Sequence, residues 1–176
     1  MSITTFFLFL FCTSSTLVNA TELKVGDKAP HFKLQATNGK TYDLNDYLGK
    51  QTVVLAWYPK ANTYGCTLEC RSLVKKGHLI REFNAVYMMA SVDPLKKNIK
   101  FAKEQKVDFP MLSDPTKKVA EAYDVLNFLN VASRVTFYIG KDGTILKIDD
   151  DVNAEKAAQD IARILEQLKI EPQQGF

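Results

Sequence analysis

The sequence predicts one α/β domain with a mixed central sheet, helices on both faces and an N-terminal β-hairpin extension. Two continuous β-branched and aromatic runs, Thr52–Pro59 and Ala85–Val92, are typical of strands buried on both faces of a sheet. A helical pattern follows each run, and such strand–helix–strand units join parallel strands through right-handed crossovers. A hairpin signal at Lys141–Gly143 adds an antiparallel edge.

The bulk composition is that of a soluble globular protein. The chain has 176 residues, enough for one domain with its own core, and is 46% hydrophobic and 24% charged. Its net charge of +3 is small and both signs are interspersed, so nothing in it indicates a nucleic-acid partner. These numbers disfavour a disordered or membrane-embedded chain.

The first twenty residues differ from the rest because they carry no charged side chain. Their apolar run, Phe6–Phe11, is too short to span a membrane, and the stretch ends in the A-x-A-like sequence Val18–Ala20. We expect a secretory signal peptide at 1–20, cut near Ala20, and an exported domain at 21–176 without stable membrane insertion. The alternative is a short buried N-terminal helix or strand. Cleavage would remove Cys12 and leave two cysteines in a compartment that permits disulfides.

The first half of the mature chain contains a hairpin, a buried strand and a helix. Two extended stretches, His31–Gln35 and Thr41–Leu44, flank the turn signal Asn38-Gly39. The buried run Thr52–Pro59 follows and ends at its proline. A helical pattern then extends from Cys66 to Phe83.

The second half continues the alternation and closes with a hairpin and a helix. The expected elements are a strand at Ala85–Val92, a helix at Leu95–Gln105 with Ile99 and Phe101–Ala102 inward, an extended piece at Phe109–Leu112, a helix at Lys117–Tyr123 with Thr116 as its N-cap, strands at Val135–Ile139 and Thr144–Ile148, and a helix at Ala154–Leu168. This order of elements is that of a thioredoxin-like fold.

The loop between the first buried strand and its helix is the candidate site. In open α/β sheets, function lies beyond the carboxyl ends of the strands, often where a loop enters a helix. Cys66 is expected in the first helical turn, where free N–H groups and the helix dipole favour a thiolate. Thr63 can point its hydroxyl at the same spot, and Pro59 with Trp57-Tyr58 would shield it from water. The alternative for Cys66 is a small buried hydrophobic residue.

The stretch Pro59-x-x-x-Thr63-x-x-Cys66 matches the P-x-x-x-T-x-x-C signature of the peroxiredoxins. The resemblance spans about Leu23 to Leu168, and the C-T-x-E sequence at Cys66 is most similar to the bacterioferritin-comigratory or Q-type subfamily. Four further segments resemble the family in the right order: VGDKAPHFKL, SVDP, FPMLSDPTKKVAEAYDV and SRVTFYIGKDGTI.

The resemblance implies a thiol-dependent peroxidase that reduces hydrogen peroxide and organic hydroperoxides in antioxidant defence. Cys66 would be the peroxidatic cysteine, whose thiolate becomes a sulfenic acid. The Thr63 hydroxyl, the Cys66 N–H and the Arg134 guanidinium would stabilise the leaving oxygen. Glu69 would orient an arginine, although an acidic residue in a first helical turn is equally consistent with its position. The resemblance also implies thioredoxin or another dithiol as reductant and a monomer. The sequence contains no P-loop, G-x-G-x-x-G or metal-cluster motif, so we expect no metal and no other cofactor.

The second cysteine, Cys70, departs from the family pattern. Q-type enzymes often carry a resolving cysteine five residues after the first, whereas here the spacing is four. Residues four apart on a helix have parallel Cβ vectors about 6 Å apart, and a disulfide needs about 3.8 Å. If Cys70 resolves Cys66, local unfolding of about Thr67–Ser72 must accompany oxidation. The alternative is a one-cysteine peroxidase, resolved by an external thiol, with Cys70 packed in the core.

Three rival functions are each disfavoured by a feature of the sequence. Exported copper-binding thioredoxin-like proteins also use C-x-x-x-C, but they need a distant histidine, and neither His31 nor His78 is expected near the cysteines. A disulfide oxidoreductase would need C-x-x-C, and Val135 occupies the place of the proline that faces its cysteines. A catalytically idle binding domain would not need Thr63, Cys66 and Arg134 together.

Overall fold

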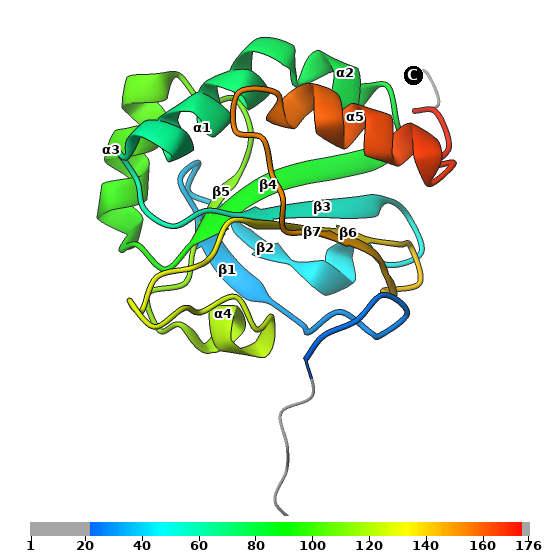
Figure 1. The fold of residues 1–176 in the computed structure, drawn as a ribbon, viewed down its shortest axis with the longest axis horizontal. Helices are drawn as coiled ribbons and strands as arrows, with labels where there is room; N and C mark the ends of the chain where they lie inside the picture. Colours follow the sequence, from blue (N-terminus) through cyan, green and yellow to red (C-terminus); the bar gives the residue numbers. More distant parts are fainter. Residues whose placement is uncertain (1–21, 174–176) are drawn as a thin grey trace, which may run out of the picture.

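The computed structural model describes residues 22–173, so the predicted signal peptide lies outside the described residues. Its centre is a seven-stranded mixed sheet in the order β2-β1-β5-β4-β3-β6-β7 (Figure 1). The strands are β1 (Lys33–Ala36), β2 (Thr41–Asp43), β3 (Thr52–Trp57), β4 (Ala85–Ser91), β5 (Met111–Ser113), β6 (Val135–Ile139) and β7 (Ile145–Asp149). The pairs β3–β4 and β4–β5 are parallel. Both predicted hairpins, β1–β2 and β6–β7, are antiparallel, and so are the pairings of β1 with β5 and of β3 with β6.

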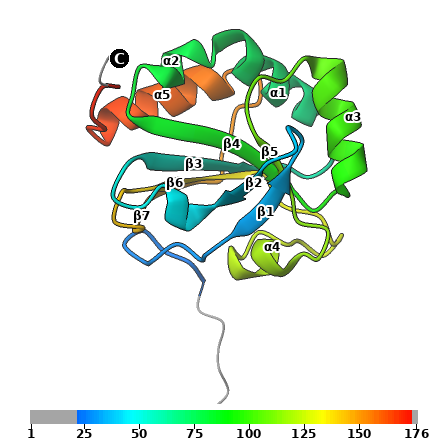
Figure 2. The same cartoon turned by 180° about the vertical axis from the view of Figure 1, so that it is seen from behind.

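Helices cover both faces of the sheet, which confirms the predicted fold class. One face carries α1 (Tyr64–Lys76), α2 (His78–Arg81), α3 (Leu95–Gln105) and α5 (Ala157–Gln167), and the other carries the short α4 (Lys118–Ala122) (Figures 1 and 2). A single 3-10 turn at Leu44–Asp46 follows β2. No helix within residues 22–173 is long and apolar enough to cross a bilayer.

The sheet separates two hydrophobic cores. Successive side chains of β3 point to opposite faces of the sheet and so pack alternately in one core and the other. Val54, Ala56 and Tyr58 pack under α1 and α5 in the same cluster as Cys66 and Cys70. Trp57 packs in the opposite cluster, with its ring centroid 6.1 Å from that of Tyr123. The prediction that Trp57 shields the cysteine pocket was therefore wrong, because successive strand side chains point to opposite faces.

The helix predicted for Cys66–Phe83 is in fact two helices, divided at Gly77. A Cβ at this position would lie 2.1 Å from the Tyr87 hydroxyl and 2.5 Å from the Leu73 carbonyl, so no larger side chain fits. Arg81 holds that hydroxyl in place by donating to it from Nη1 at 2.8 Å. The break therefore lies where the backbone contacts Tyr87 of β4.

The structure also corrects the predicted N-cap of the fourth helix. Lys117, in the left-handed region at φ 63°, occupies the cap position of α4 without a side-chain hydrogen bond. The buried Asp114 carboxylate accepts the Val119 and Ala120 N–H groups, each at 2.9 Å. Thr116 instead donates its hydroxyl to the Asp114 carboxylate. The free N–H groups of the first turn of α4 are therefore satisfied by Asp114, two residues before the predicted cap.

Two other predictions about α3 and α5 need adjustment. The bounds of α3 agree with the prediction, and Phe101 and Ala102 are buried, but Ile99 is 42% exposed. Asn98 takes the inward position instead, because residues 98, 101 and 102 share a helix face. In α5 the helix begins three residues later than predicted, with Leu168 only partly buried after its last turn.

Candidate active site

Cys66 is the third residue of α1 and is completely buried. Thr63 precedes the helix in an extended conformation, with φ −87° and ψ 156°, and its carbonyl accepts the Thr67 N–H at 2.9 Å. The Cys66 sulfur therefore lies in the first turn, where the backbone N–H groups lack intrahelical acceptors and the positive end of the helix dipole favours an anion. The local sequence thus produces the predicted environment for a thiolate.

Arg134 lies beside Cys66, although the two are 68 residues apart in the chain. Antiparallel pairing of β6 with β3 sets Val135 opposite Trp57, which brings the preceding arginine to the carboxyl end of β3. Its Nη2 donates to Cys66 Sγ at 3.2 Å. Sheet register therefore delivers the predicted cation to the sulfur.

Glu69, one turn after Cys66 on α1, holds the other side of the same guanidinium. Arg134 donates from Nη1 to the Glu69 carboxylate, which is 1% exposed, while the arginine side chain is 21% exposed. The guanidinium is held in one orientation, because the Glu69 carboxylate accepts from Nη1 and the Cys66 sulfur accepts from Nη2. The structure thus places Glu69 against Arg134, and its orienting role stays a prediction.

Gly65 lies directly under the arginine, a contact that sequence reasoning missed. A Cβ on Gly65 would come within 3.2 Å of Arg134 Nη2, tighter than an ordinary van der Waals contact. No sequence motif assigned this glycine a role. Its lack of a side chain lets the guanidinium approach the first turn of α1 closely.

Thr63 is exposed, and its hydroxyl is turned into its own loop. It donates to the Lys60 carbonyl at 3.0 Å, and it makes no side-chain cap of α1. Thr63 is close to Cys66 in the sequence, but in the structure its hydroxyl makes no hydrogen bond to Cys66 Sγ. The reach of this side chain toward a bound substrate stays a prediction.

Tyr58 and Pro59 form the wall between β3 and the cysteine loop. Tyr58 is fully buried in the cluster that contains both cysteines, and its hydroxyl donates to Asn98 Oδ1 at 2.8 Å. Burial raises the pKa of Tyr58, so it remains a neutral donor. β3 ends at Trp57, two residues before the predicted end at Pro59, which is half-buried and has no N–H for a further ladder bond.

Two polar residues behind the loop were not predicted as part of the site. Asn98 is fully buried and donates from Nδ2 to Ser113 Oγ at 2.7 Å and to Ser91 Oγ at 3.1 Å. Asp93 accepts the Ala61 N–H at 2.7 Å. The only sequence signal for Asp93 was the SVDP segment, which carried no assigned role.

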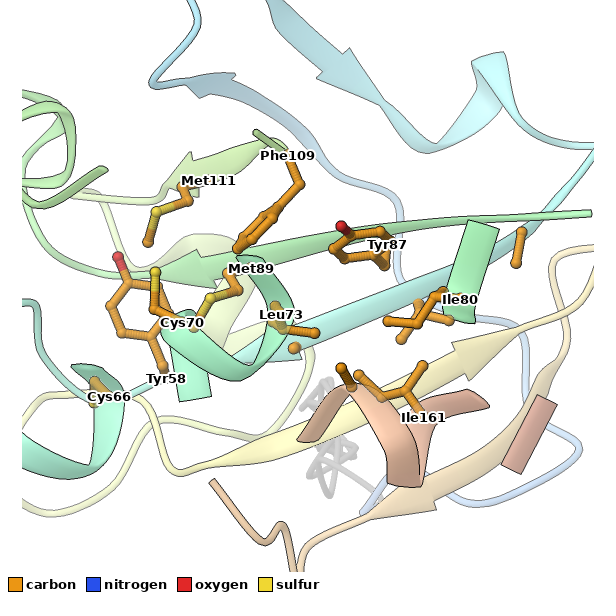
Figure 3. Close-up of a cluster of buried hydrophobic side chains, with 14 of the residues drawn as sticks. Tyr58, Cys66, Cys70, Leu73, Ile80, Tyr87, Met89, Phe109, Met111 and Ile161 are labelled. Atoms are coloured by element: carbon orange, nitrogen blue, oxygen red, sulfur yellow. The ribbon is translucent and has the colours of Figure 1, made fainter. Parts of the chain in front are cut away.

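Cys70 lies one turn after Cys66 and deeper in the core. It packs among Tyr58, Met89 and Met111, while Cys66 lies at the edge of the same cluster (Figure 3). Both are free thiols. Burial raises the pKa of Cys70 to about 12, so this thiol is protonated at neutral pH as long as α1 is intact.

The two histidines lie away from the cysteines. His31 Nε2 is 2.7 Å from Asp43 Oδ1 in the opening hairpin, and His78 is exposed at the start of α2. In the part of the chain that the structure describes, no three His, Cys, Asp or Glu side chains converge as metal ligands. The geometry instead presents one buried sulfur to one fixed cation, which suits nucleophilic attack with a leaving group that gains negative charge.

Comparisons with known proteins give consistent results. A model of the AhpC/TSA family matches residues 25–148. Peroxiredoxin Bcp of Bacillus subtilis is 33% identical over 155 residues, covering 84% of this chain and 96% of that protein. Peroxiredoxin Bcp of Escherichia coli K12 is 32% identical over 136 residues, covering 73% and 86%.

Solved structures show the same relationship. Peroxidoxin BcpB from Mycobacterium tuberculosis superposes with a TM-score of 0.75 at 30% identity, covering 82% of this chain and 97% of that one. A cysteine-to-serine mutant of PrxQ from Xylella fastidiosa also superposes with a TM-score of 0.75, at 25% identity, covering 84% and 98%. The similarity therefore covers nearly the whole length of these relatives.

Proposed function

This chain belongs to the AhpC/TSA family and is a thiol peroxidase of the peroxiredoxin type, and we propose that Cys66 is its peroxidatic residue. The proposed substrates are hydrogen peroxide and organic hydroperoxides. The observation that carries the assignment is the hydrogen bond from Arg134 Nη2 to Cys66 Sγ at 3.2 Å, in the first turn of α1. A fixed cation and a helix N-terminus together stabilise the thiolate that the reaction requires.

In the first step, the Cys66 thiolate attacks one oxygen of the hydroperoxide. An S–O bond forms and the O–O bond breaks, so the sulfur is oxidised to a sulfenic acid and the peroxide is reduced. The leaving hydroxide or alkoxide takes up a proton and departs as water or an alcohol. Arg134 is placed to stabilise the charge that develops on that oxygen, and we propose that the Thr63 hydroxyl and the Cys66 N–H assist it.

In the second step, we propose that Cys70 resolves the sulfenic acid. The Cys70 thiol gives up its proton and its sulfur attacks Cys66 Sγ, so that an S–S bond forms, the S–O bond breaks, and the departing hydroxide takes up a proton to become water. The buried Cys70 cannot do this from an intact helix, because its pKa is raised to about 12 and a helix keeps the two Cβ atoms about 6 Å apart. The α1 segment from about Thr67 to Ser72 must therefore unwind.

Unwinding this segment breaks identifiable contacts. Thr67 loses the bond from its hydroxyl to the Thr63 carbonyl at 2.8 Å, and Glu69 loses Arg134. Ser72 Oγ accepts the Ala158 N–H of α5 at 3.2 Å, which ties the end of the segment to the core. A peroxidase with only Cys66 in its cycle, resolved by an external thiol, would leave these contacts intact.

The mass of the protein after oxidation separates the two cycles. With one equivalent of hydrogen peroxide and no reductant, we expect the wild-type protein to lose two hydrogens, as a Cys66–Cys70 disulfide forms. Cys70→Ser should instead gain one oxygen, and Cys66→Ser should keep its mass. Intact mass spectrometry checks all three. If the wild type only gains oxygen and never loses two hydrogens, the proposed disulfide is wrong.

The disulfide then requires a dithiol reductant, and we propose thioredoxin or a similar protein. The cycle uses only cysteine chemistry, so the proposal includes no cofactor. We also propose that the protein acts as a monomer.

Export after cleavage near Ala20 is a proposal that rests on the sequence alone. When the full chain is produced in a secreting host, we expect Thr21 to be the first residue of the exported protein, as measured by N-terminal peptide mapping. Recovery of the protein in the cytoplasm with Met1–Ala20 attached would contradict the proposal.

A further inference from the structure

We propose that Asp93 is a positioning residue for Cys66, holding the loop that enters α1 so that the sulfur faces Arg134. The inference rests on the proposed function, since it concerns the reactivity of the same thiolate. Asp93 follows β4, on a different part of the chain, and its carboxylate oxygen Oδ2 accepts the Ala61 N–H at 2.7 Å. It does not touch Cys66, so its effect must pass through the loop.

The loop between β3 and α1 has few other fixed points. Tyr58 donates its backbone N–H to Ala90 at 2.9 Å, and Pro59 has no N–H to donate. Ala61 is buried at 3% exposure, so its N–H has little access to water and needs a protein acceptor. Asp93 supplies that acceptor immediately before a bend in the loop.

That bend is at Asn62, which adopts the left-handed region at φ 66°. Asparagine enters this region more readily than other residues with a side chain, so Asn62 can make the bend at little cost. The Asp93 bond fixes the residue before the bend, and α1 begins two residues after it, at Tyr64. A shift of Ala61 would therefore move the first turn of the helix, and Cys66 with it, away from the guanidinium.

The remaining oxygen of Asp93 pairs with Lys97. Its Oδ1 lies 2.7 Å from Lys97 Nζ, and the aspartate side chain is only 11% exposed. Asp93 also lies just before α3, so a purely structural role at that helix end is the rival explanation. The two oxygens have separate partners, which allows the two roles to be separated by substitution.

Three variants make this separation. Asp93→Ala removes both contacts, Asp93→Asn keeps an acceptor oxygen for the Ala61 N–H, and Lys97→Met removes only the ion pair. For Asp93→Ala we expect a loss of about tenfold or more in the rate constant for peroxide, since a 1 Å misplacement of reacting groups can cost ~10²-fold. We also expect the acid limb of the pH–rate profile to move to higher pH. Asp93→Asn should recover most of the rate, and Lys97→Met should react like the wild type.

Single-turnover peroxide consumption across pH, with circular dichroism to establish folding, provides the readout. A folded Asp93→Ala protein with the rate and pH profile of the wild type would overturn the inference. So would a Lys97→Met protein as slow as Asp93→Ala. Hydrogen exchange of the wild-type protein adds a test independent of any variant, because the Ala61 amide should be protected, and rapid exchange there would contradict the proposed bond.

Cys66→Ser in the same assay distinguishes failure of this inference from failure of the proposed function. If Cys66→Ser consumes peroxide as fast as the wild type, the proposed function fails, and the role of Asp93 fails with it. If Cys66→Ser is inert while Asp93→Ala matches the wild type, only the role of Asp93 is wrong.

Discussion

Replacing Cys66 with serine is expected to abolish peroxide reduction. The serine hydroxyl is not ionised at neutral pH, so the enzyme loses its nucleophile while the shape of the buried site is nearly preserved. Removal of a catalytic nucleophile elsewhere costs on the order of 10⁶-fold in kcat, and we expect turnover here to fall to the level of the uncatalysed assay. Peroxide consumption with a thioredoxin system measures the loss.

Cys70→Ser is the matched control for that experiment, since it makes the same chemical change one helical turn away in the same buried cluster. It should retain a rapid first reaction with peroxide and lose only the disulfide-dependent part of the cycle. Unchanged turnover in Cys66→Ser, or a first reaction that disappears only in Cys70→Ser, would contradict the assignment of the nucleophile.

Loss of the Arg134 guanidinium has the second largest expected effect. In the proposed mechanism Arg134 stabilises both the Cys66 thiolate and the leaving oxygen, so its removal should lower the rate constant for peroxide by about 10²–10³-fold, the cost of removing one preorganised donor.

A direct Arg134→Met substitution would leave the buried Glu69 carboxylate without its partner, which costs about 3–5 kcal/mol in comparable pairs. The cleaner comparison is Glu69→Gln against Glu69→Gln combined with Arg134→Met, because neither protein then contains the unpaired carboxylate. Single-turnover kinetics and thermal unfolding of the two proteins separate the catalytic loss from any loss of stability. Equal rate constants for the two proteins would show that Arg134 has no catalytic role.

Sequence reasoning succeeds where the determining pattern is local. The continuous apolar runs predict β3 and β4, because strands buried on both faces need such runs. The turn residues near Gly39 and Gly143, both at positive φ, predict the two hairpins. The placement of Cys66 in a first helical turn follows from the same local signals, and only its exact offset from the helix start differed.

It fails where a distant residue decides the outcome. The break at Gly77 depends on the hydroxyl of Tyr87, which belongs to the next strand, β4. The spacing of apolar residues within a helix carries no information about such a contact. Thr116 is a plausible cap on propensity alone, yet the buried Asp114 competes successfully for the same N–H groups. Trp57 differs from Tyr58 by one position, which is enough to put it on the other face of the sheet.

The candidate site shows the same division. Arg134 could be predicted only through the family resemblance, because its approach to Cys66 depends on the register between β6 and β3. Asp93 could not be predicted at all, since its partner is a backbone N–H in a loop with no regular structure. Whether the Thr63 hydroxyl meets the substrate is likewise a matter of loop geometry, and in this structure the hydroxyl is bonded to Lys60.

The central claim is that the Cys66 sulfur takes the oxygen from peroxide. The most direct measurement is to treat Cys70→Ser with one equivalent of hydrogen peroxide, trap the sulfenic acid with a carbon nucleophile specific for it, and map the adduct by peptide mass spectrometry. We predict a single adduct on the peptide that contains Cys66, formed at the rate at which peroxide disappears. Disappearance of peroxide without an adduct at Cys66 would contradict the claim.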